Sequence, residues 1–428
     1  MEKVKAVLIG AGMRGMFAYA PYALNHPNEL EFIAVAEPDE ERRRLFAQKH
    51  NIPDELCFRS WEELLDQGRI ADSALICTQD SMHFQPALKA LAAGYHILLE
   101  KPMSNNVEEC AALEMAAQKY SRLFQICHVL RYTPFFSNIK KLLETKRIGE
   151  LVSIQHNENV GYYHQAHSYV RGNWRNSIEA SPMILAKSCH DLDILVWLAG
   201  ADCSKLSSFG GLMHFRTENA PENAPDRCSD GCPVEEECPY NALKLYNFDD
   251  GKWQTGVLRK AVCMEDTPEA LLHALKTGPY GRCVYRCDND VVDHQVLNIE
   301  FANGVTAAFT MCAFTKEISR TIKLMGTMGE IRGHMELNEI EILDFCTGNS
   351  ETIKLHASEL GHGGGDEGII RDFIRAVNTE GDRGLSSIGK SVQSHLMAFA
   401  AEESRRNGKV MDMAIYKEEV NRRVLAKS

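Results

Sequence analysis

Long apolar runs and an excess of positive charge are both missing from this sequence. No apolar run in its 428 residues approaches the roughly 18 to 20 residues that a membrane-spanning helix requires, and the N-terminus lacks the charged segment and apolar core of a secretory signal. Lys and Arg number 47 against 59 Asp and Glu, a formal charge of −12, so no broad basic field is available to attract nucleic acid or anionic lipid. We therefore expect a cytoplasmic protein with neither a nucleic-acid nor a membrane partner.

Cysteine, by contrast, is abundant, with 14 in the chain. Hydrophobic residues make up 44% and charged residues 25% of the sequence, which is the ordinary range for a globular protein with a substantial core. A disulfide framework is not expected in the reducing cytosol. The cysteines therefore need another explanation.

The pattern of the N-terminal part predicts an α/β domain. Short apolar β runs alternate with amphipathic helical stretches, which is typical of a parallel sheet wrapped by helices. We predict a Rossmann domain with a doubly wound parallel sheet over residues 1–127. Beyond it, longer alternating strands predict an α+β domain over residues 128–428 with a large, mostly antiparallel open sheet. An aperiodic, proline-bearing stretch at about 214–290 is interpreted as an insertion.

A glycine-rich turn follows the first predicted strand directly. Gly10, Gly12 and Gly15 form GxGxxG, and Glu37 ends the next strand. In this context the glycines allow a tight turn, a close approach of the backbone to a pyrophosphate, and close helix–strand packing. A carboxylate at Glu37 can accept both ribose hydroxyls and would repel a 2′-phosphate. NAD is therefore favoured over NADP as the cofactor, although the cations at 42–44 lie close to this position.

Further motifs carry a family resemblance. Glu100, Lys101 and Pro102 follow the fourth predicted unit, and HDLD spans residues 190–193. Together with GAGMRG at 10–15 and CTQDSMH at 77–83, these motifs resemble the Gfo/Idh/MocA oxidoreductases, and the resemblance covers nearly the whole chain outside the insertion. It implies NAD-dependent hydride transfer at a secondary hydroxyl of a sugar, cyclitol or glycoside. It also implies a homodimer or homotetramer.

The resemblance assigns roles to individual residues. Lys101 matches the family lysine beside the nicotinamide and the reacting hydroxyl, where an ammonium can stabilise alkoxide character. His190 matches the histidine that takes or returns the hydroxyl proton. The positions that match cofactor contacts in the family, besides Lys101, are Met13, Arg14, Thr78, His83 and Glu100.

One departure from the family pattern affects the catalytic group. Many members have an aspartate four residues before the histidine, where this chain has Ala186. Lys187 and His190 are three residues apart, so both can face the site from one helix. We infer that Lys187 replaces the aspartate in orienting the substrate. Asp191 and Asp193 either orient the imidazole or cap and solvate the helix.

Segment 161–177 is dense in aromatic and hydrogen-bonding side chains. Aromatic faces pack on sugar C–H surfaces, while His, Arg and Asn side chains bind hydroxyls. The glycine run after His362 predicts a mobile loop, with Asp366 as the N-cap of the next helix. The substrate candidates are Tyr163, His164, His167, Arg171, Trp174 and Arg175 in this segment, of which we expect about half to reach the ligand, and Arg131 and His362 outside it.

Five cysteines cluster in and just after the insertion. A four-thiolate site would tie such an aperiodic segment with zinc or an iron–sulfur cluster, and the alternative is a set of reduced, unligated thiols. Other cysteines, such as Cys77 and Cys127, lie in apolar strands and are interpreted as core residues. Cys283 belongs to the cluster, but the four residues we choose as ligands are Cys228, Cys232, Cys238 and Cys287.

Two other functions fit the same motifs. A glycoside hydrolase could oxidise its substrate transiently, expel the aglycone by elimination and return the hydride, so that NAD is recycled. A sensor of a sugar or nucleotide could keep the fold without catalysis, but the presence of both Lys101 and His190 argues against it.

Overall fold

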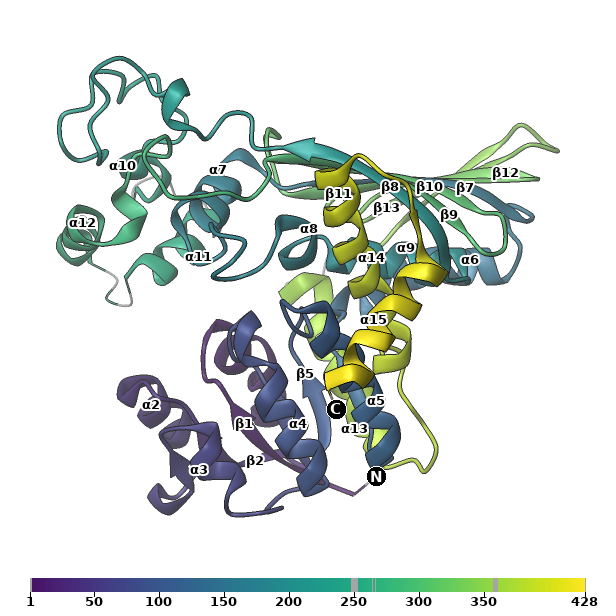
Figure 1. Ribbon diagram of the computed structural model, residues 1–428, viewed down its shortest axis with the longest axis horizontal. Helices are drawn as coiled ribbons and strands as arrows, with labels where there is room; N and C mark the ends of the chain where they lie inside the picture. Colours follow the sequence, from purple (N-terminus) through teal and green to yellow (C-terminus); the bar gives the residue numbers. More distant parts are fainter. Residues whose placement is uncertain (1, 248–252, 264, 266, 357–360, 428) are drawn as a thin grey trace.

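Two β-sheets organise the protein (Figure 1). The computed structural model describes residues 2–247, 253–263, 265, 267–356 and 361–427. Six parallel strands form the first sheet in the order β3-β2-β1-β4-β5-β6, so the predicted Rossmann fold is confirmed. Its strand order reverses between β1 and β4, where doubly wound sheets bind ligands. The strands are β1 (Val4–Ile9), β2 (Leu30–Ala36), β3 (Cys57–Phe58), β4 (Ser73–Ile76), β5 (His96–Leu99) and β6 (Phe124–Ile126).

Local capping sets the ends of the helices beside this sheet. Asp39 accepts a hydrogen bond from the third residue of α2 (Glu40–His50), and Asn106 caps α5 (Val107–Tyr120) in the same way. Such side chains satisfy backbone N–H groups that the helix leaves unpaired. Gly94 has a φ of 92° and ends its helix with the left-handed cap that glycine favours. The other helices of this layer are α1 (Pro21–Asn25), α3 (Trp61–Leu65) and α4 (Phe84–Ala93).

Nine strands form the second sheet, in the order β14-β13-β12-β11-β7-β10-β9-β8-β15. Every neighbouring pair is antiparallel except β7 and β10, which are parallel. The predicted large, mostly antiparallel sheet is therefore confirmed. Its strands are β7 (Leu151–Asn159), β8 (Cys203–Gly211), β9 (His294–Phe301), β10 (Thr306–Cys312), β11 (Ser319–Gly326), β12 (Gly329–His334), β13 (Glu339–Asp344), β14 (Ser350–Lys354) and β15 (Met411–Asp412).

One face of the second sheet is covered by helices that lie between it and the Rossmann part (Figure 1). Buried and exposed residues alternate along β9, as expected for a strand with one packed face and one free face. The packed face and its helices belong to one apolar core that continues into the first sheet. The covering helices are α6 (Pro134–Glu144), α8 (Met183–Ala186), α9 (Cys189–Ala199) and α14 (Ile388–Asn407).

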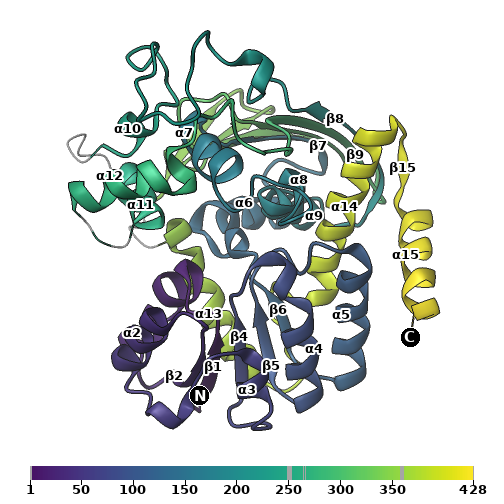
Figure 2. The same ribbon diagram turned by 60° about the vertical axis from the view of Figure 1, so that its left-hand side comes forward.

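Helix α13 (Gly365–Val377) returns to the Rossmann part late in the chain (Figure 2). Ile369, Ile370 and Phe373 are buried in one cluster with the side chains on one face of β1. A layer of the first domain is thus supplied by a segment within the range predicted for the second. The domain boundary at residue 127 stays a prediction. It divides the chain by position, and α13 packs on the first domain although it lies after this boundary.

The described residues between β8 and β9, where the insertion is predicted at about 214–290, form an excursion from the second sheet. They extend beyond the end of the second sheet (Figure 1) and have small apolar clusters of their own. None of the helices in the described part of the chain is both long and apolar enough to cross a membrane. The helices of the excursion are α10 (Ala242–Leu245), α11 (Trp253–Val262) and α12 (Pro268–Thr277).

A buried ion pair joins the end of the Rossmann part to α9. Arg131 follows β6, and its Nε and Nη2 donate to the two carboxylate oxygens of Asp193 at 2.6 and 2.7 Å. Its Nη1 donates to the carbonyl oxygen of Leu385, and the Arg131 side chain is only 2% exposed. These contacts occupy the guanidinium, so the expectation that Arg131 binds substrate is wrong. Asp193 neither solvates the helix nor caps it.

We expect Arg131→Met to destabilise the protein by roughly 3–5 kcal/mol, because it leaves the Asp193 carboxylate buried without its cation. The shift of the urea unfolding transition measures this loss. Arg422→Ala breaks an exposed pair with Glu418 and should change stability by less than about 1 kcal/mol. Equal effects of the two substitutions would contradict the structural role of Arg131.

Candidate active site

The glycine turn lies at the carboxyl end of β1 and is shaped by close backbone contacts. Gly10 has a φ of 92°, and a Cβ there would meet the carbonyl oxygen of Cys77 at 2.7 Å. A Cβ on Gly15 would meet the carbonyl oxygen of Gly10 at 2.3 Å, whereas one on Gly12 would meet nothing within 4 Å. Gly10 and Gly15 therefore close the turn, and Gly12 faces open space that suits the pyrophosphate of a dinucleotide.

Glu37 directly follows β2 beside this turn and is buried. Its Oε2 accepts a hydrogen bond from the backbone N of Ala11 at 2.8 Å. Its Oε1 accepts from the backbone N of Asp39 and from Nη2 of Arg42 at 2.8 Å. The carboxylate is thus held at the edge of the glycine turn, where its predicted role toward the ribose requires it. Arg42 forms an ion pair with this carboxylate.

Arg14 belongs to a network of charges behind the glycine turn. Its guanidinium contacts Glu100 Oε1 at 2.6 Å and Asp366 Oδ1 at 2.7 Å, and the Tyr19 hydroxyl donates to Glu100. Burial acts to raise the pKa of Glu100, but Arg14 and Lys101 outweigh it and lower that pKa. Arg14 and Glu100 were predicted to touch the cofactor, and here they tie the turn to α13 and to the end of β5.

His362 and Asp366 contact this network from the later part of the chain. Asp366 Oδ1 lies 3.1 Å from Nδ1 of His362. The N-cap of α13 is Gly364, and the Asp366 side chain points to Arg14 and His362 instead. The prediction that Asp366 caps the helix is therefore wrong. His362 has a φ of 48°, and its ring lies 6.2 Å from that of His190, so one predicted substrate residue lies beside the predicted catalytic histidine.

Two expected cofactor residues have their polar atoms engaged within the protein. The ring nitrogens of His83 lie 2.6 Å from the carbonyl oxygen of Pro102 and 3.1 Å from that of Thr78. The Thr78 hydroxyl donates to the carbonyl oxygen of Met82. His83 is buried and therefore positions the loop after β4 against the loop after β5. Met13 is 44% exposed and remains accessible at the turn.

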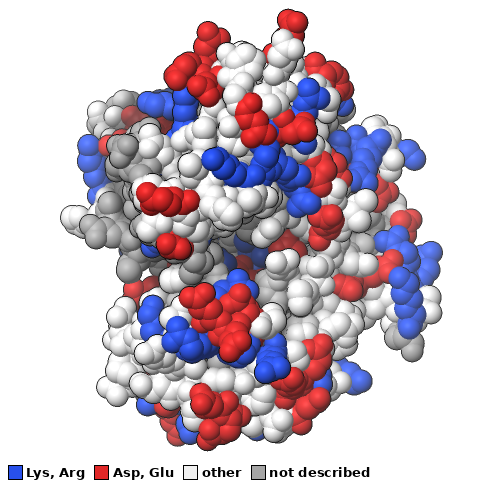
Figure 3. All heavy atoms as spheres, turned by 90° about the vertical axis from the view of Figure 1, so that its left-hand side faces the viewer, with Lys and Arg blue, Asp and Glu red and all other residues white. Residues whose placement is uncertain are grey.

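Lys101 and His190 are brought to the same crevice from different domains. Lys101 follows β5, and its Nζ donates to the carbonyl oxygen of Ala186 at 2.8 Å, at the end of α8. His190 lies in the first turn of α9 and is buried. In the described part of the chain, its Nδ1 has no hydrogen-bond partner. Figure 3 shows a hollow between the two halves of the molecule, on a face where charges of both signs are interspersed.

Burial and nearby cations control the ionisation of His190. Burial lowers the pKa of its imidazole well below the ordinary value, and the charge of Lys101 and the neighbouring His128 lower it further. The His128 ring lies 5.7 Å from the His190 ring. A neutral imidazole in this position can accept a proton, and the ammonium beside it can stabilise an oxyanion.

Glu158 is a site residue that the sequence analysis missed. It is fully buried on β7, 3.2 Å from Nζ of Lys187 and 2.6 Å from Nη2 of Arg320. Burial raises the pKa of Glu158, although Arg320 and Lys187 oppose the shift. The alternation of buried residues along β7 is the signal that could have found it. The Glu158 carboxylate therefore contacts Lys187. This places a carboxylate beside the residue that follows Ala186, where many family members have an aspartate.

Asp191 lies beneath the same charges. Its carboxylate contacts Arg320 at 2.9 Å and His156 at 2.8 Å. Burial acts to raise the pKa of Asp191, and Arg320 and His156 outweigh it and lower that pKa to about 2. Two alternatives were given for Asp191. These contacts do not fit the one in which it caps and solvates the helix. It anchors the first turn of α9, and thereby His190, to the second sheet.

The aromatic segment divides into residues that reach the crevice and residues that do not. Burial and the charge of Lys187 lower the pKa of His164 well below its ordinary value. Trp174 Nε1 lies 3.5 Å from Oδ1 of Asp80, which follows β4 in the Rossmann part. Trp174 therefore spans the two domains at the mouth of the site.

Other residues of this segment turn toward the excursion. Nδ1 of His167 lies 2.8 Å from the Tyr246 hydroxyl, and its ring stacks on Tyr280. Arg175 pairs with Asp288 at 2.9 Å. The expectation that His167 and Arg175 bind substrate is therefore wrong. Arg171 also points into the excursion, and the Tyr163 ring packs against Tyr162.

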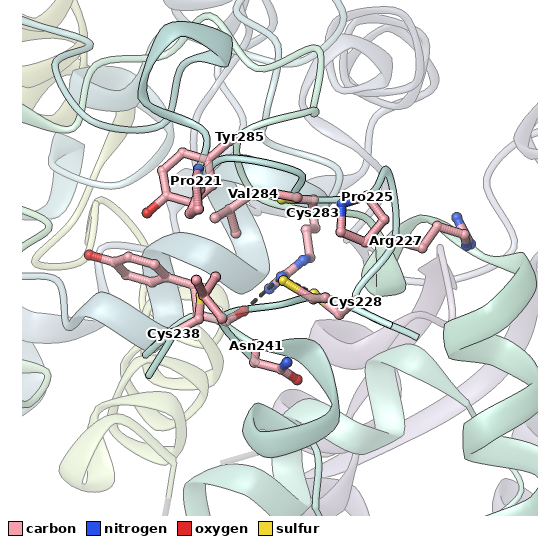
Figure 4. Close-up of a pocket in the computed structure, with 14 residues that line it drawn as sticks. Pro221, Pro225, Arg227, Cys228, Cys238, Asn241, Cys283, Val284 and Tyr285 are labelled. Carbon is pink, nitrogen blue, oxygen red and sulfur yellow. Dashed lines mark hydrogen bonds between the residues drawn. The ribbon is translucent and has the colours of Figure 1, made fainter. Parts of the chain in front are cut away.

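The thiols of the excursion are gathered differently from the predicted set. Cys228, Cys232, Cys238 and Cys283 line one small cavity (Figure 4). Cys287 is not among the lining residues, and its thiol donates to the carbonyl oxygen of Cys283. As they stand, no three or more His, Cys, Asp or Glu side chains in the described part of the chain are arranged to hold a metal ion.

A Rossmann domain with a glycine turn, joined to a second domain whose helix α9 supplies a histidine, is the arrangement of a dinucleotide-dependent oxidoreductase. The chain belongs to the Gfo/Idh/MocA family. Residues 4–128 match the family model described as "Oxidoreductase family, NAD-binding Rossmann fold". Residues 140–413 match the model of its C-terminal alpha/beta domain.

Named relatives share moderate to low identity with this chain. YteT of Bacillus subtilis (strain 168), a protein named as an oxidoreductase, is 22% identical over 80% of this chain and 82% of its own length. Inositol 2-dehydrogenase of Corynebacterium glutamicum (strain R) is 26% identical over 47% of this chain and 55% of its own length. The structure of levoglucosan dehydrogenase with NADH and L-sorbose has a TM-score of 0.71 at 20% identity, covering 96% of this chain and 99% of the other.

We expect the His190 imidazole to stay neutral as the pH falls through about 6.5, the ordinary histidine pKa, because burial and Lys101 disfavour its charged form. Histidine-labelled protein would be followed by NMR during an acid titration. The His190→Asn variant identifies the resonance by its loss. A midpoint near or above the ordinary value would contradict this environment for His190.

Proposed function

We propose that the protein is an NAD-dependent dehydrogenase acting on a secondary hydroxyl of a sugar, cyclitol or glycoside. The observation that carries the proposal is the convergence of Lys101 and His190 on one crevice. In the described part of the chain the Lys101 ammonium hydrogen-bonds only to the Ala186 carbonyl oxygen, so its remaining N–H donors are available to a substrate oxygen. Nδ1 of His190 is buried, and Nε2, which forms no hydrogen bond within the described part of the chain, is the ring nitrogen open to a substrate.

The reaction follows from the protonation states of these two residues. Lys101 donates a hydrogen bond to the substrate hydroxyl and stabilises the oxygen as it gains alkoxide character. The neutral His190 imidazole accepts the hydroxyl proton. NAD, when bound, would supply the hydride acceptor for the same carbon, so that the secondary alcohol and NAD would become a ketone and NADH, and the proton would stay on His190. Gly12 and Glu37 would hold the pyrophosphate and ribose, and their geometry fits both groups.

The substrate class is supported by the side chains around the crevice. Trp174 offers an aromatic face at the domain junction, and His164 offers a neutral imidazole beside the cations. The Lys187 ammonium forms an ion pair with Glu158, and Glu158 also pairs with Arg320. Polar groups and an aromatic face are what a polyhydroxylated ring requires. Relatives named for inositol and levoglucosan dehydrogenation support the same class.

We also propose a homo-oligomer built on the free face of the second sheet. Val152 on β7, Val296 on β9 and Phe209 on β8 are 51%, 39% and 60% exposed. Apolar side chains on a free sheet face favour burial against another copy. A cytoplasmic location is supported by the thiols, because all 14 cysteines are unpaired.

We expect Lys101→Met and His190→Asn each to lower kcat by roughly 10²–10⁴-fold, because each removes a group that acts on the substrate oxygen. NADH formation would be followed by absorbance with NAD and a panel of inositols, hexoses, anhydrosugars and glycosides. Lys390→Met, at an exposed lysine, is the control and should retain full activity.

Two outcomes of this experiment would overturn the proposal. Absence of NADH across the whole panel, with NAD binding intact, would favour a sensor. Release of nitrophenol from nitrophenyl glycosides without net NADH would favour the hydrolase that recycles NAD. Retention of activity in both variants would remove Lys101 and His190 from the mechanism.

We expect Glu37→Ser to raise the ratio of kcat/KM with NADP to kcat/KM with NAD by roughly tenfold or more, because it removes a charge that repels the 2′-phosphate. Arg42, released from Glu37, would then be available to the phosphate. Glu41→Ser, in the exposed first turn of α2, is the matched control. An unchanged ratio in the Glu37 variant would place the ribose elsewhere.

A further inference from the structure

Two separated segments bring four thiols to one cavity in the excursion. Cys228, Cys232 and Cys238 come from a turn-rich loop, and Cys283 comes from the segment that follows α12. Figure 4 labels Cys228, Cys238 and Cys283 around this cavity. Cys232 and Arg171 line the same cavity, and Arg171 donates to the Tyr240 carbonyl oxygen.

Backbone pairing fixes this convergence. Residues 227 and 282 form an antiparallel bridge, in which the backbone N of Cys228 donates to the carbonyl oxygen of Gly281 at 3.0 Å. The backbone N of Cys283 donates to the carbonyl oxygen of Asp226 at 2.8 Å. The two cysteines are therefore held side by side, on either side of the bridge, although more than fifty residues separate them in the chain. Cys287 lies beyond the bridge.

Arg171 places an uncompensated positive charge at the same cavity. It is 1% exposed, its Nε donates to the carbonyl oxygen of Arg282, and its Nη2 donates to that of Tyr240, each at 2.7 Å. Nη2 also lies 3.6 Å from the Cys228 sulfur, and Nη1 has no partner among the described residues. No carboxylate in the described part of the chain forms an ion pair with it. A buried cation of this kind requires an anion nearby.

We propose that Cys228, Cys232, Cys238 and Cys283 bind one zinc ion as a structural tetrathiolate centre. The four thiols release four protons to solvent, and four thiolates with Zn²⁺ carry a net charge of −2. This anionic centre supplies the counter-charge that Arg171 lacks, and the free Nη1 donates to its sulfurs. The sulfurs turn inward on binding, because zinc–thiolate bonds are about 2.3 Å long and the thiols as they stand are not at ligand spacing.

The size of the cavity selects a single ion. The cavity has a volume of about 10 Å³, which is room for about one water molecule. An iron–sulfur cluster contains several iron and sulfide atoms and would need much more space. The centre ties the loop at 221–241 to Arg171 and to Cys283, in a region whose own apolar clusters are small. It is independent of the proposed dehydrogenase reaction.

Metal analysis of the purified, full-length protein tests this assignment. We expect about one zinc per chain in the wild type, and loss of the zinc in Cys228→Ser and Cys283→Ser. Cys287→Ser and Cys346→Ser, which change a neighbouring thiol and an exposed thiol, are matched controls and should retain it. A zinc-free wild type after growth and refolding with zinc, iron with acid-labile sulfide, or loss in Cys287→Ser with retention in Cys283→Ser would each overturn the proposal.

A second measurement does not depend on the folding of the cysteine variants. Titration of the wild-type protein with a mercurial thiol reagent should release zinc to a chromogenic chelator as the four thiols react. Arg171→Met should weaken zinc binding roughly 10–100-fold in competition with a chelator, and Arg171→Lys should restore part of it. Release of no zinc, or equal affinities in wild type and Arg171→Met, would contradict the centre or the role of Arg171 in it.

Discussion

The ion network of Arg14, Glu100 and Asp366 is the interaction on which the rest of the site depends. One guanidinium holds two buried carboxylates, one from the end of β5 and one from α13. Because a buried charge that loses its partner is costly, the glycine turn, the loop that carries Lys101 and the helix that follows the second sheet are fixed relative to one another. The position of Lys101 is a consequence of this arrangement.

A second set of buried charges fixes the other half of the crevice. Asp191 and Glu158 share Arg320, and through it the first turn of α9 is anchored to β7. His190 is therefore placed by a charge network of the second sheet, and Lys101 by one of the first. The two networks meet at the hydrogen bond from Lys101 to Ala186. The desolvation that makes these networks rigid also keeps the imidazole neutral.

The sequence predicted what depends on short-range patterns. The parallel sheet, its glycine turn and Glu37 follow from local periodicity and spacing, and both sheets were predicted correctly. The parallel pairing of β7 with β10 could not be predicted, because the two strands are far apart in the chain. The motif residues Lys101 and His190 converge on one crevice. His167, Arg175 and Arg131 were mistaken for ligands because a polar residue type does not reveal which way its side chain points.

The same limit explains the cysteines and the missed carboxylate. Spacing alone could not separate Cys283 from Cys287, since the choice is made by a backbone bridge to residue 227. Glu158 has no motif around it. Only the alternation of buried residues along β7 indicates that its side chain points inward. Non-local register, and not composition, decides which polar groups are buried together.

The late return of α13 to the Rossmann part has a consequence for synthesis. The apolar face of β1 that α13 covers is complete as soon as the first strands leave the ribosome, but Ile369 and Ile370 are translated only after most of the second domain. The nucleotide-binding half must wait, with that face unsatisfied, for nearly the whole polypeptide to emerge.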